Sequence, residues 1–205
     1  MNLVLYLHSQ TKLNPIMKKL NAILAMVLIA GTTFAQTWSL DKAHSRVGFL
    51  VPHYAITEVE GNFKDFDASV VSKADDFNGA EVTFTAKTAS VDTDNEKRDG
   101  HLKSGDFFDA EKFPELSFKG KLVKDGGKYK LKGDVTMKGV TKPAEFDVTY
   151  GGTVDTGRGL KAGFKLSGEL NRQDFGVSYG GKTPGGELVI GDKVTVTAKI
   201  ELNKA

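Results

Sequence analysis

Three histidines, His44, His53 and His101, are the residues beyond the N-terminal leader best suited to metal or acid–base chemistry. Three imidazoles are the number that a catalytic zinc ion uses. The spacing does not favour a metal, because His44 and His53 lie nine residues apart across an expected strand, with no HExxH motif and no cysteine to assist. We expect hydrogen-bonding histidines and no metal ion.

Nucleophilic catalysis lacks its usual residues in this sequence. There is no cysteine, and Ser45 follows His44 on a strand, where neighbouring side chains point to opposite faces. The acidic pair Asp75-Asp76 lies in an expected turn, where such side chains bond the backbone. We therefore expect that the protein is not an enzyme.

Four polar side chains are candidates for contact with the headgroup of a ligand. His53 and His101 are suited to donating a hydrogen bond to an oxygen atom, since small-molecule sites are mostly apolar with a few placed polar groups. Arg98 and Arg172 are suited to a phosphate or a carbonyl. For each of the four, the alternative interpretation is a side chain with a local structural or solvated role.

The N-terminus has the pattern of a secretion signal. A basic start at Met17-Lys18-Lys19 precedes an apolar run over residues 22–30, and Thr33-Phe34-Ala35 is a small-x-small cleavage site before Gln36. Residues 1–16 are either an over-called start or an extended basic region. The apolar run is shorter than the roughly 20 residues of a membrane-spanning helix. We predict residues 1–35 to be a cleaved leader that leaves no membrane anchor.

Composition limits what the mature chain does. Residues 36–205 are 170 residues, the size of one domain. The leader holds three lysines and no acidic residue, so its removal lowers the formal net charge from +2 to −1. Without a basic stripe, we expect no binding to nucleic acid. The absence of cysteine means that packing alone stabilises the fold, and we expect the protein in the periplasm or secreted.

Alternation of apolar and polar residues runs through most of the mature chain and predicts eight or nine antiparallel strands. Their apolar faces must either close into a barrel or stack as two sheets, and the alternation leaves both open. A barrel of about eight strands is filled by side chains or holds one small ligand. The clearest alternating segments are residues 46–51, 81–87, 116–122, 128–137, 146–150, 164–166 and 194–202, with further strands near 56–71 and 187–190.

Two local signals interrupt the strands. Lys124 to Gly127 predicts a tight hairpin, because Asp-Gly and Gly-Gly adopt positive φ at little cost. Thr93 to Glu96 matches a capping box, which predicts a short helix to about Ser104 with Gly105 in the left-handed conformation. With Leu102 as its one apolar residue, this helix is expected to be a lid over one mouth of the barrel.

Thirteen phenylalanines and several small residues bear on whether the interior is filled. A filled core is the simpler interpretation for most of these rings. Small residues at inward positions favour an open channel instead, and such apolar cavities stay dry and take apolar guests. The small residues expected to leave this space are Gly48, Gly61, Ala86, Gly133 and Ala198.

The order of several motifs resembles the YceI-like family over residues 37–203. The resemblance implies an extended, lipocalin-like antiparallel barrel whose interior binds a polyisoprenoid, an isoprenoid quinone or a fatty amide, often in a homodimer, with links to stress responses. This sequence departs from the family pattern at Gly100 and at 179–184. The matching motifs are Trp38-Ser39-Leu40-Asp41, residues 44–49, His53, residues 61–66, residues 90–93, residues 98–108, residues 113–118 and residues 133–143.

We therefore predict an all-β fold, an extended antiparallel eight-stranded lipocalin-like barrel with a short helical lid, that holds a long-chain lipid without catalysis and without a cofactor. Two alternatives remain: an enzyme that modifies such a lipid with His53 or His101 as acid or base, and a structural β-protein with a filled core. The residues predicted to contact the lipid are Phe49, His53, Ile56, Phe63, Phe66, Phe84, Arg98, His101, Leu102, Phe108, Phe118, Arg172 and Phe175.

Overall fold

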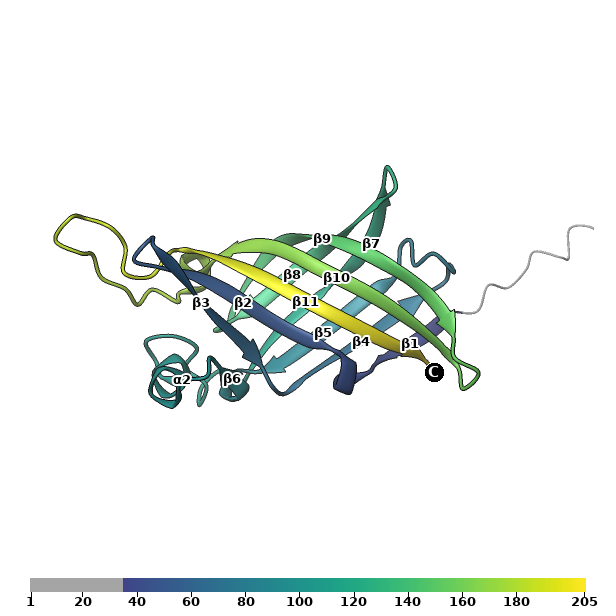
Figure 1. Cartoon of the computed structure of the whole chain (residues 1–205), viewed down its shortest axis with the longest axis horizontal. Coiled ribbons are helices and arrows are strands. Elements are labelled where there is room, and N and C mark those ends of the chain that lie inside the picture. Colours follow the sequence, from purple (N-terminus) through teal and green to yellow (C-terminus); the bar gives the residue numbers. More distant parts are fainter. Residues whose placement is uncertain (1–34) are drawn as a thin grey trace, which may run out of the picture. The chain divides into compact units, whose positions relative to one another are not determined.

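The structure, a computed structural model, describes residues 35–205, and its strands form one antiparallel sheet (Figure 1). Of the predicted leader, residues 1–35, all but Ala35 lie outside the described residues. The strands are β1 (Gln36–Leu40), β2 (Arg46–His53), β3 (Thr57–Phe63), β4 (Phe66–Ser72), β5 (Glu81–Lys87), β6 (Val91–Asp92), β7 (Glu115–Asp125), β8 (Lys128–Met137), β9 (Val140–Asp155), β10 (Leu160–Asn171) and β11 (Lys193–Lys204). The helices are η1 (Lys42–His44), η2 (Thr88–Ser90), α2 (Glu96–Lys103) and η3 (Arg172–Phe175).

A closed barrel forms because β1 pairs with strands on both of its sides. Trp38 is opposite Val70 on β4 and also opposite Lys204 on β11, which joins the two ends of the sheet. The ring runs β1-β4-β5-β7-β8-β9-β10-β11 and back to β1. This confirms the predicted eight-stranded antiparallel barrel and excludes two stacked sheets.

The remaining strands widen one end of the barrel. The N-terminal half of β11 pairs with β2, and β2 carries β3 and then the two-residue β6. On its outer side β3 pairs with β6 only through Asn62 and Phe63. Beyond that point no described strand continues the wall between β3 and β7, and the chain there is residues 93–114, which include α2. We call this stretch the lid segment.

Two predicted strands differ from the structure. Residues 56–71 form β3 and β4 with a bend at Lys64-Asp65, where Lys64 N donates to Ser90 O and Asp65 N to Ser90 Oγ, so η2 fixes the bend. Residues 187–190 form only isolated bridges, between His53 and Ile190 and between Lys182 and Leu188.

The helix is present where it was predicted and ends within one residue of the predicted Ser104, but its predicted N-cap was wrong. Asn95, rather than Thr93, is the N-cap, and its Oδ1 accepts from Arg98 N at 3.0 Å. The amide and hydroxyl of Thr93 both donate to Asp99 Oδ1, so that carboxylate replaces the expected Glu96 contact. The helix ends at Lys103, and Gly105 is not left-handed.

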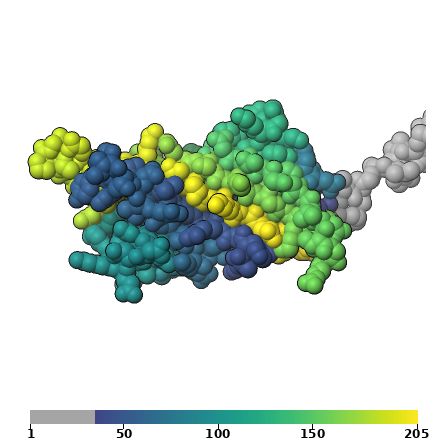
Figure 2. All heavy atoms as spheres, viewed as in Figure 1, coloured from purple at the N-terminus to yellow at the C-terminus, as the bar shows by residue number. Residues whose placement is uncertain are grey.

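The two ends of the barrel differ. In Figure 1 the lid segment and the loop 176–192 lie at one end, and the C-terminus and the β9–β10 turn lie at the other. Figure 2 shows the same arrangement, with the lid segment in teal and the loop in yellow-green. Within residues 35–205 no helix has both the length and the apolar character needed to cross a membrane.

Candidate functional site

A cavity of about 660 Å³ lies inside the barrel. This volume is within the range of about 300–1,000 Å³ that small-molecule sites occupy. Inward-facing residues of β2 to β5 and of β7 to β11 line it, in the alternation that the sequence predicted. The interior is therefore not filled by side chains from end to end.

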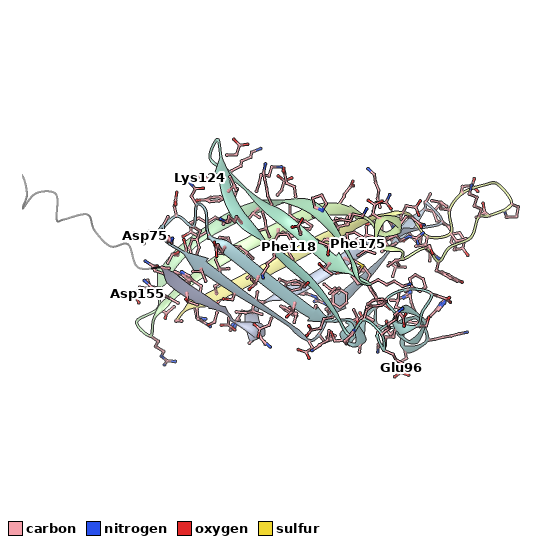
Figure 3. All side chains as sticks on the ribbon, turned by 180° about the vertical axis from the view of Figure 1, so that it is seen from behind. Asp75, Glu96, Phe118, Lys124, Asp155 and Phe175 are labelled. Carbon is pink, nitrogen blue, oxygen red and sulfur yellow. The ribbon has the colours of Figure 1, made fainter. Side chains whose placement is uncertain are left out.

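The wall changes character along the barrel. Its middle is apolar, with residues such as Val82, Phe118, Phe146 and Val196. Figure 3 shows Phe118 near the centre of the barrel and Phe175 closer to the lid segment. Except for Ser117, the polar and amphipathic lining residues belong to the end of β2, the lid segment, η3 or the loop that follows it. They are His53, Asn95, Lys97, Arg98, His101, Arg172 and Tyr179. We call this end the mouth.

Eleven of the thirteen predicted contact residues line the cavity. Ile56 does not, because it lies at the tip of the β2–β3 hairpin with 85% of its surface exposed. Phe66 is also outside the lining, in a second buried cluster with Phe63, Ala86 and Val91. The other eleven are Phe49, His53, Phe63, Phe84, Arg98, His101, Leu102, Phe108, Phe118, Arg172 and Phe175.

The small residues only partly explain the hollow. Gly48 and Ala198 line the cavity, as expected, whereas Gly61, Ala86 and Gly133 do not. A Cβ at Gly133 would lie 2.2 Å from Lys119 O, so this glycine serves the close approach of β7 and β8. A Cβ at Gly61 would lie 2.4 Å from Phe49 Cζ, so this glycine makes room for a ring.

Arg172 is buried and uses all of its donors within the protein. Nε donates to Gly191 O at 2.9 Å, and Nη1 donates to the carbonyls of Val177 and Tyr179, each at 2.7 Å. Nη2 donates to Ile190 O at 3.2 Å and to an oxygen of Asp192 at 2.9 Å. Because a guanidinium has five N–H groups, none remains for a ligand. Arg172 thus fixes the loop 176–192 over the mouth.

Arg98 has a local role as well. Its Nε donates to Thr93 Oγ1 and its Nη2 to Thr93 O, both at 2.7 Å. Thr93 is 5% exposed and also donates to Asp99. Arg98 and Asp99 together hold the turn that precedes α2, and this fixes where the helix starts.

His101 is the centre of a contact across the mouth. Its Nε2 lies 2.8 Å from Asp106 Oδ2, and its ring lies 5.0 Å from that of Phe107 and 4.7 Å from that of Tyr179. The rings of Phe107 and Tyr179 are 5.0 Å apart. We call these three rings the latch, since they join the lid segment to the loop 176–192.

His53 is half-buried at the end of β2. Its ring centroid lies 4.2 Å from that of Tyr54, with the two rings tilted by 59°, and its backbone bridges to Ile190. No carboxylate bonded to its ring is found in residues 35–205. His53 thus offers a free ring nitrogen at the mouth, whereas His101 already has a carboxylate partner.

The sequence reasoning missed part of the mouth. Phe107, Val177, Tyr179, Val189 and Ile190 line the cavity but were not predicted as contacts. Four of them lie in the loop 176–192, where the sequence predicted only a strand near 187–190, and the position of that loop depends on Arg172. The departure of residues 179–184 from the family pattern was the one signal that pointed to this loop.

His44 belongs to a separate polar cluster outside the cavity lining. Ligand atoms of Asp41, His44 and Glu201 lie within 4.8 Å of one another. Lys161 Nζ lies 2.7 Å from a carboxylate oxygen of Asp41 and from one of Glu201, so an ammonium already neutralises them. The Lys161 ammonium, and then His44, holds the pKa of Asp41 well below its usual range.

The closed ring, the apolar cavity and the lidded mouth define a lipocalin-like barrel. The model of the YceI-like domain matches residues 38–202. The chain belongs to the YceI-like family, as the motifs predicted.

Related proteins share the fold across most of their length. A UPF0312 protein of Staphylococcus aureus is 33% identical over 168 residues, covering 81% of this chain and 96% of the relative. The crystal structure of the Campylobacter jejuni YCEI protein is also 33% identical, with a TM-score of 0.62 over 81% of this chain and 96% of that one. A polyisoprenoid-binding domain from Saccharophagus degradans shares the fold at 13% identity, with a TM-score of 0.61 over 82% of this chain and 98% of that one.

Proposed function

We propose that this protein binds a long apolar lipid chain in the barrel cavity and does not chemically change it. The observation that carries the proposal is the distribution of polarity, with an apolar interior and polar groups gathered at the mouth. A molecule with a long hydrocarbon chain and one polar end fits this distribution. The name of the Saccharophagus degradans domain supports polyisoprenoids as one such class.

Burial of hydrocarbon supplies the affinity in this proposal. Transfer of a CH₂ group from water contributes about 0.8 kcal/mol, and freezing of the chain offsets part of this gain. Hydrocarbon contacts distinguish weakly between greasy chains. The ligand classes in this proposal are those that the family resemblance implies, a polyisoprenoid, an isoprenoid quinone or a fatty amide, and hydrocarbon contacts do not choose among them.

The polar end of the ligand is expected at His53, His101 and Lys97, which line the mouth. Lys97 has no ion-pair partner within residues 35–205. Arg172 is excluded from this role because its five N–H groups are used within the protein. An uncharged carbonyl or hydroxyl, or one phosphate, suits such a sparse set of donors.

The proposal places this protein in the periplasm or outside the cell, after cleavage of the leader before Gln36. There it serves in transport, storage or stress protection of the lipid, without a cofactor and without nucleic acid. A homodimer is the expected assembly. Sedimentation of the mature chain measures the assembly directly.

Extraction of the natively purified protein with organic solvent, followed by mass spectrometry of the extract, tests the proposal. We expect a long-chain lipid near one molecule per protein chain. An extract without such a lipid, together with no uptake of added isoprenoid alcohol or fatty amide, would contradict it.

Catalysis on the same lipid is a second candidate function, and the His101–Asp106 contact of 2.8 Å at the mouth favours it. A carboxylate that orients an imidazole is a common arrangement for acid–base catalysis. Turnover of a bound lipid that is lost in both His53→Ala and His101→Ala variants would support this alternative. Recovery of the lipid unchanged after long incubation would exclude it.

A further inference from the structure

We propose that Phe77 sets the depth of the cavity and so the longest lipid chain that is fully buried. Phe77 comes from the loop between β4 and β5, at the end of the barrel opposite the lid segment. The inference rests on the proposed binding of a long chain. It adds a residue that selects chain length.

Phe77 closes the barrel from a loop rather than from a strand. Its side chain is 1% exposed, and its φ of +59° is in the left-handed region. That conformation is uncommon for a bulky residue and costs about 1–3 kcal/mol. The backbone turns here so that the ring points into the barrel.

Aromatic rings surround Phe77 and form a floor, by which we mean Trp38, Phe77, Tyr150 and Phe164. The ring centroid of Phe77 lies 5.0 Å from that of Trp38, 5.5 Å from that of Tyr150 and 5.1 Å from that of Phe164. The Phe77 ring packs edge to face on Tyr150 and Phe164 and is tilted by 53° to Trp38, so it is in direct contact with all three rings.

The floor lies directly below the cavity. Phe164 belongs to the floor and also lines the cavity. Val70, the cross-strand neighbour of Trp38, lines it too, whereas Trp38, Phe77 and Tyr150 do not. One layer of rings therefore separates the cavity from the far end of the barrel, and Phe77 is the one member that no strand supplies.

The loop that carries Phe77 is firmly attached to the barrel. Tyr129 Oη donates to Asp76 O at 2.6 Å, and Gly79 N donates to Leu122 O at 2.8 Å. Lys124 contributes twice: its amide donates to Asn78 Oδ1 at 3.0 Å, and its ammonium lies 3.0 Å from an oxygen of Asp76. The floor is thus a fixed stop, in contrast to the latch at the mouth.

A fixed stop has a measurable consequence for a series of chains. While each added carbon is buried, affinity rises up to about fourfold per CH₂ before the cost of freezing it. Once the chain end reaches the floor, further carbons stay at the mouth and affinity levels off. Removal of the Phe77 ring opens space below Phe164, so the plateau moves to longer chains.

The test titrates wild-type protein and variants with straight-chain fatty amides that differ by two carbons, by displacement of a bound fluorescent fatty acid. For Phe77→Ala we expect the plateau at longer chains, with the longest amides bound about tenfold more tightly than by wild type. Phe77→Leu, which keeps more of the packing, is expected to give an intermediate plateau. Phe77→Trp is expected to move the plateau to shorter chains.

Phe66→Ala is the matched control, because Phe66 is likewise a buried phenylalanine that does not line the cavity, but it belongs to the cluster with Phe63, Ala86 and Val91 and not to the floor. It is expected to lower stability without moving the plateau. An unchanged plateau in both Phe77→Leu and Phe77→Trp, or the same shift in Phe66→Ala, would overturn the assignment of Phe77 while leaving lipid binding intact. If no amide or isoprenoid alcohol binds to wild type, the proposed function fails as well.

Discussion

Arg172 shows how a polar residue at a ligand cavity acquires a structural role. The sequence suggested a cation at the mouth, and the cation is there, but its five N–H groups bond to the loop 176–192 and Asp192. His53, by contrast, has no bonded carboxylate among the described residues. Arg172 differs from His53 because most of its hydrogen-bond partners lie in the loop 176–192, whose position the sequence did not reveal. Sequence reasoning placed both at the mouth but did not separate their roles.

Replacement of Arg172 by lysine is expected to loosen the loop 176–192. Lysine has three donors in place of five, and carbonyls left unpaired in a buried site each cost about 1–3 kcal/mol. We expect a loss of about 3 kcal/mol and a Tm lower by roughly 6–12 °C for a domain of this size. Scanning calorimetry measures the Tm, and the hydrogen-exchange rate of the Val189 amide measures how often the loop opens.

Gln173→Ala is the control for Arg172→Lys. Gln173 is exposed and also donates to Asp192 Oδ1, at 2.9 Å. Its removal therefore tests the same acceptor without loss of the buried hydrogen bonds of Arg172. It is expected to have little effect on Tm. A Tm for Arg172→Lys equal to that of wild type, with unaltered exchange at Val189, would show that the loop does not depend on the guanidinium.

The cluster around Asp41 makes stability depend on pH. Lys161, with His44 second, holds the pKa of Asp41 below its ordinary 3.8, so the unfolded chain takes up this proton at a higher pH than the folded protein. Stability from this contact is therefore present above about pH 5 and is lost as pH falls through and below 3.8. We expect Asp41→Asn to lower the Tm at neutral pH, with the difference from wild type shrinking in acid.

Unfolding scans across pH check this expectation. Glu201, which also faces Lys161 and His44, remains in the variant and keeps part of the contact. Glu201→Gln is therefore the companion variant. A Tm difference between Asp41→Asn and wild type that stays constant from neutral to acid pH would show that the carboxylate charge is not the cause.

At the scale of elements, the strands follow local alternation, whereas the lid segment is positioned by tertiary contacts. The hairpin predicted at Lys124 to Gly127 is confirmed, with Gly126 and Gly127 at φ of +54° and +90°. Alternation also fixed which face of each strand is inward. α2, in contrast, has no fully buried residue. Its position depends on Thr93, Arg98 and the latch.

The limits of prediction at this scale have a physical cause. Strand faces follow from local alternation, so the sequence reveals them. The capping-box pattern predicted that Glu96 would pair with Thr93. In the structure the amide and hydroxyl of Thr93 donate to Asp99 instead, and the helix starts later. The bend between β3 and β4 depends on Ser90, which is distant in sequence. Contacts of this kind are decided by tertiary structure.

Removal of the Tyr179 ring is expected to speed exchange of lipid at the mouth. Its ring contacts His101 and Phe107, so Tyr179→Ala releases the lid segment from the loop. We expect association and dissociation rates of a fluorescent fatty acid to rise together, by about tenfold, with a smaller change in Kd. Stopped-flow fluorescence measures both rates.

Tyr54→Ala is the control for the latch, since Tyr54 is a similarly exposed tyrosine at the mouth end but contacts His53 instead of the lid segment. Its rates are expected to stay near those of wild type. Dissociation in Tyr179→Ala as slow as in wild type would show that the latch does not limit exchange.

At the scale of the whole molecule, the cavity is the feature that strand patterns predicted least well. Thirteen phenylalanines were compatible with a filled barrel or a hollow one. The outcome depends on where the rings lie: Phe77 and its neighbours gather at one end, and Phe63, Phe66 and Phe108 gather beside the lid segment. Closure of the ring through β1 and β11 likewise joins segments from opposite ends of the mature chain.

Cleavage of the leader predicted at residues 1–35 has its own test. Cleavage before Gln36 is expected to leave 170 residues. Intact mass measurement on protein recovered from the periplasm or the medium determines the N-terminus. A mass that includes residues 17–35 would contradict cleavage, and a mass that includes residues 1–16 would show that the first methionine is used.

Calorimetric titration of wild type and Ala198→Trp with a long-chain isoprenoid alcohol tests the central claim most directly. Ala198 lines the middle of the cavity, so an indole there occupies the hollow without disturbing the mouth. We expect wild type to bind one molecule with a negative heat-capacity change, and the variant to keep its fold while binding about a hundredfold more weakly or not at all. Equal affinity in a folded Ala198→Trp variant would contradict binding inside the barrel.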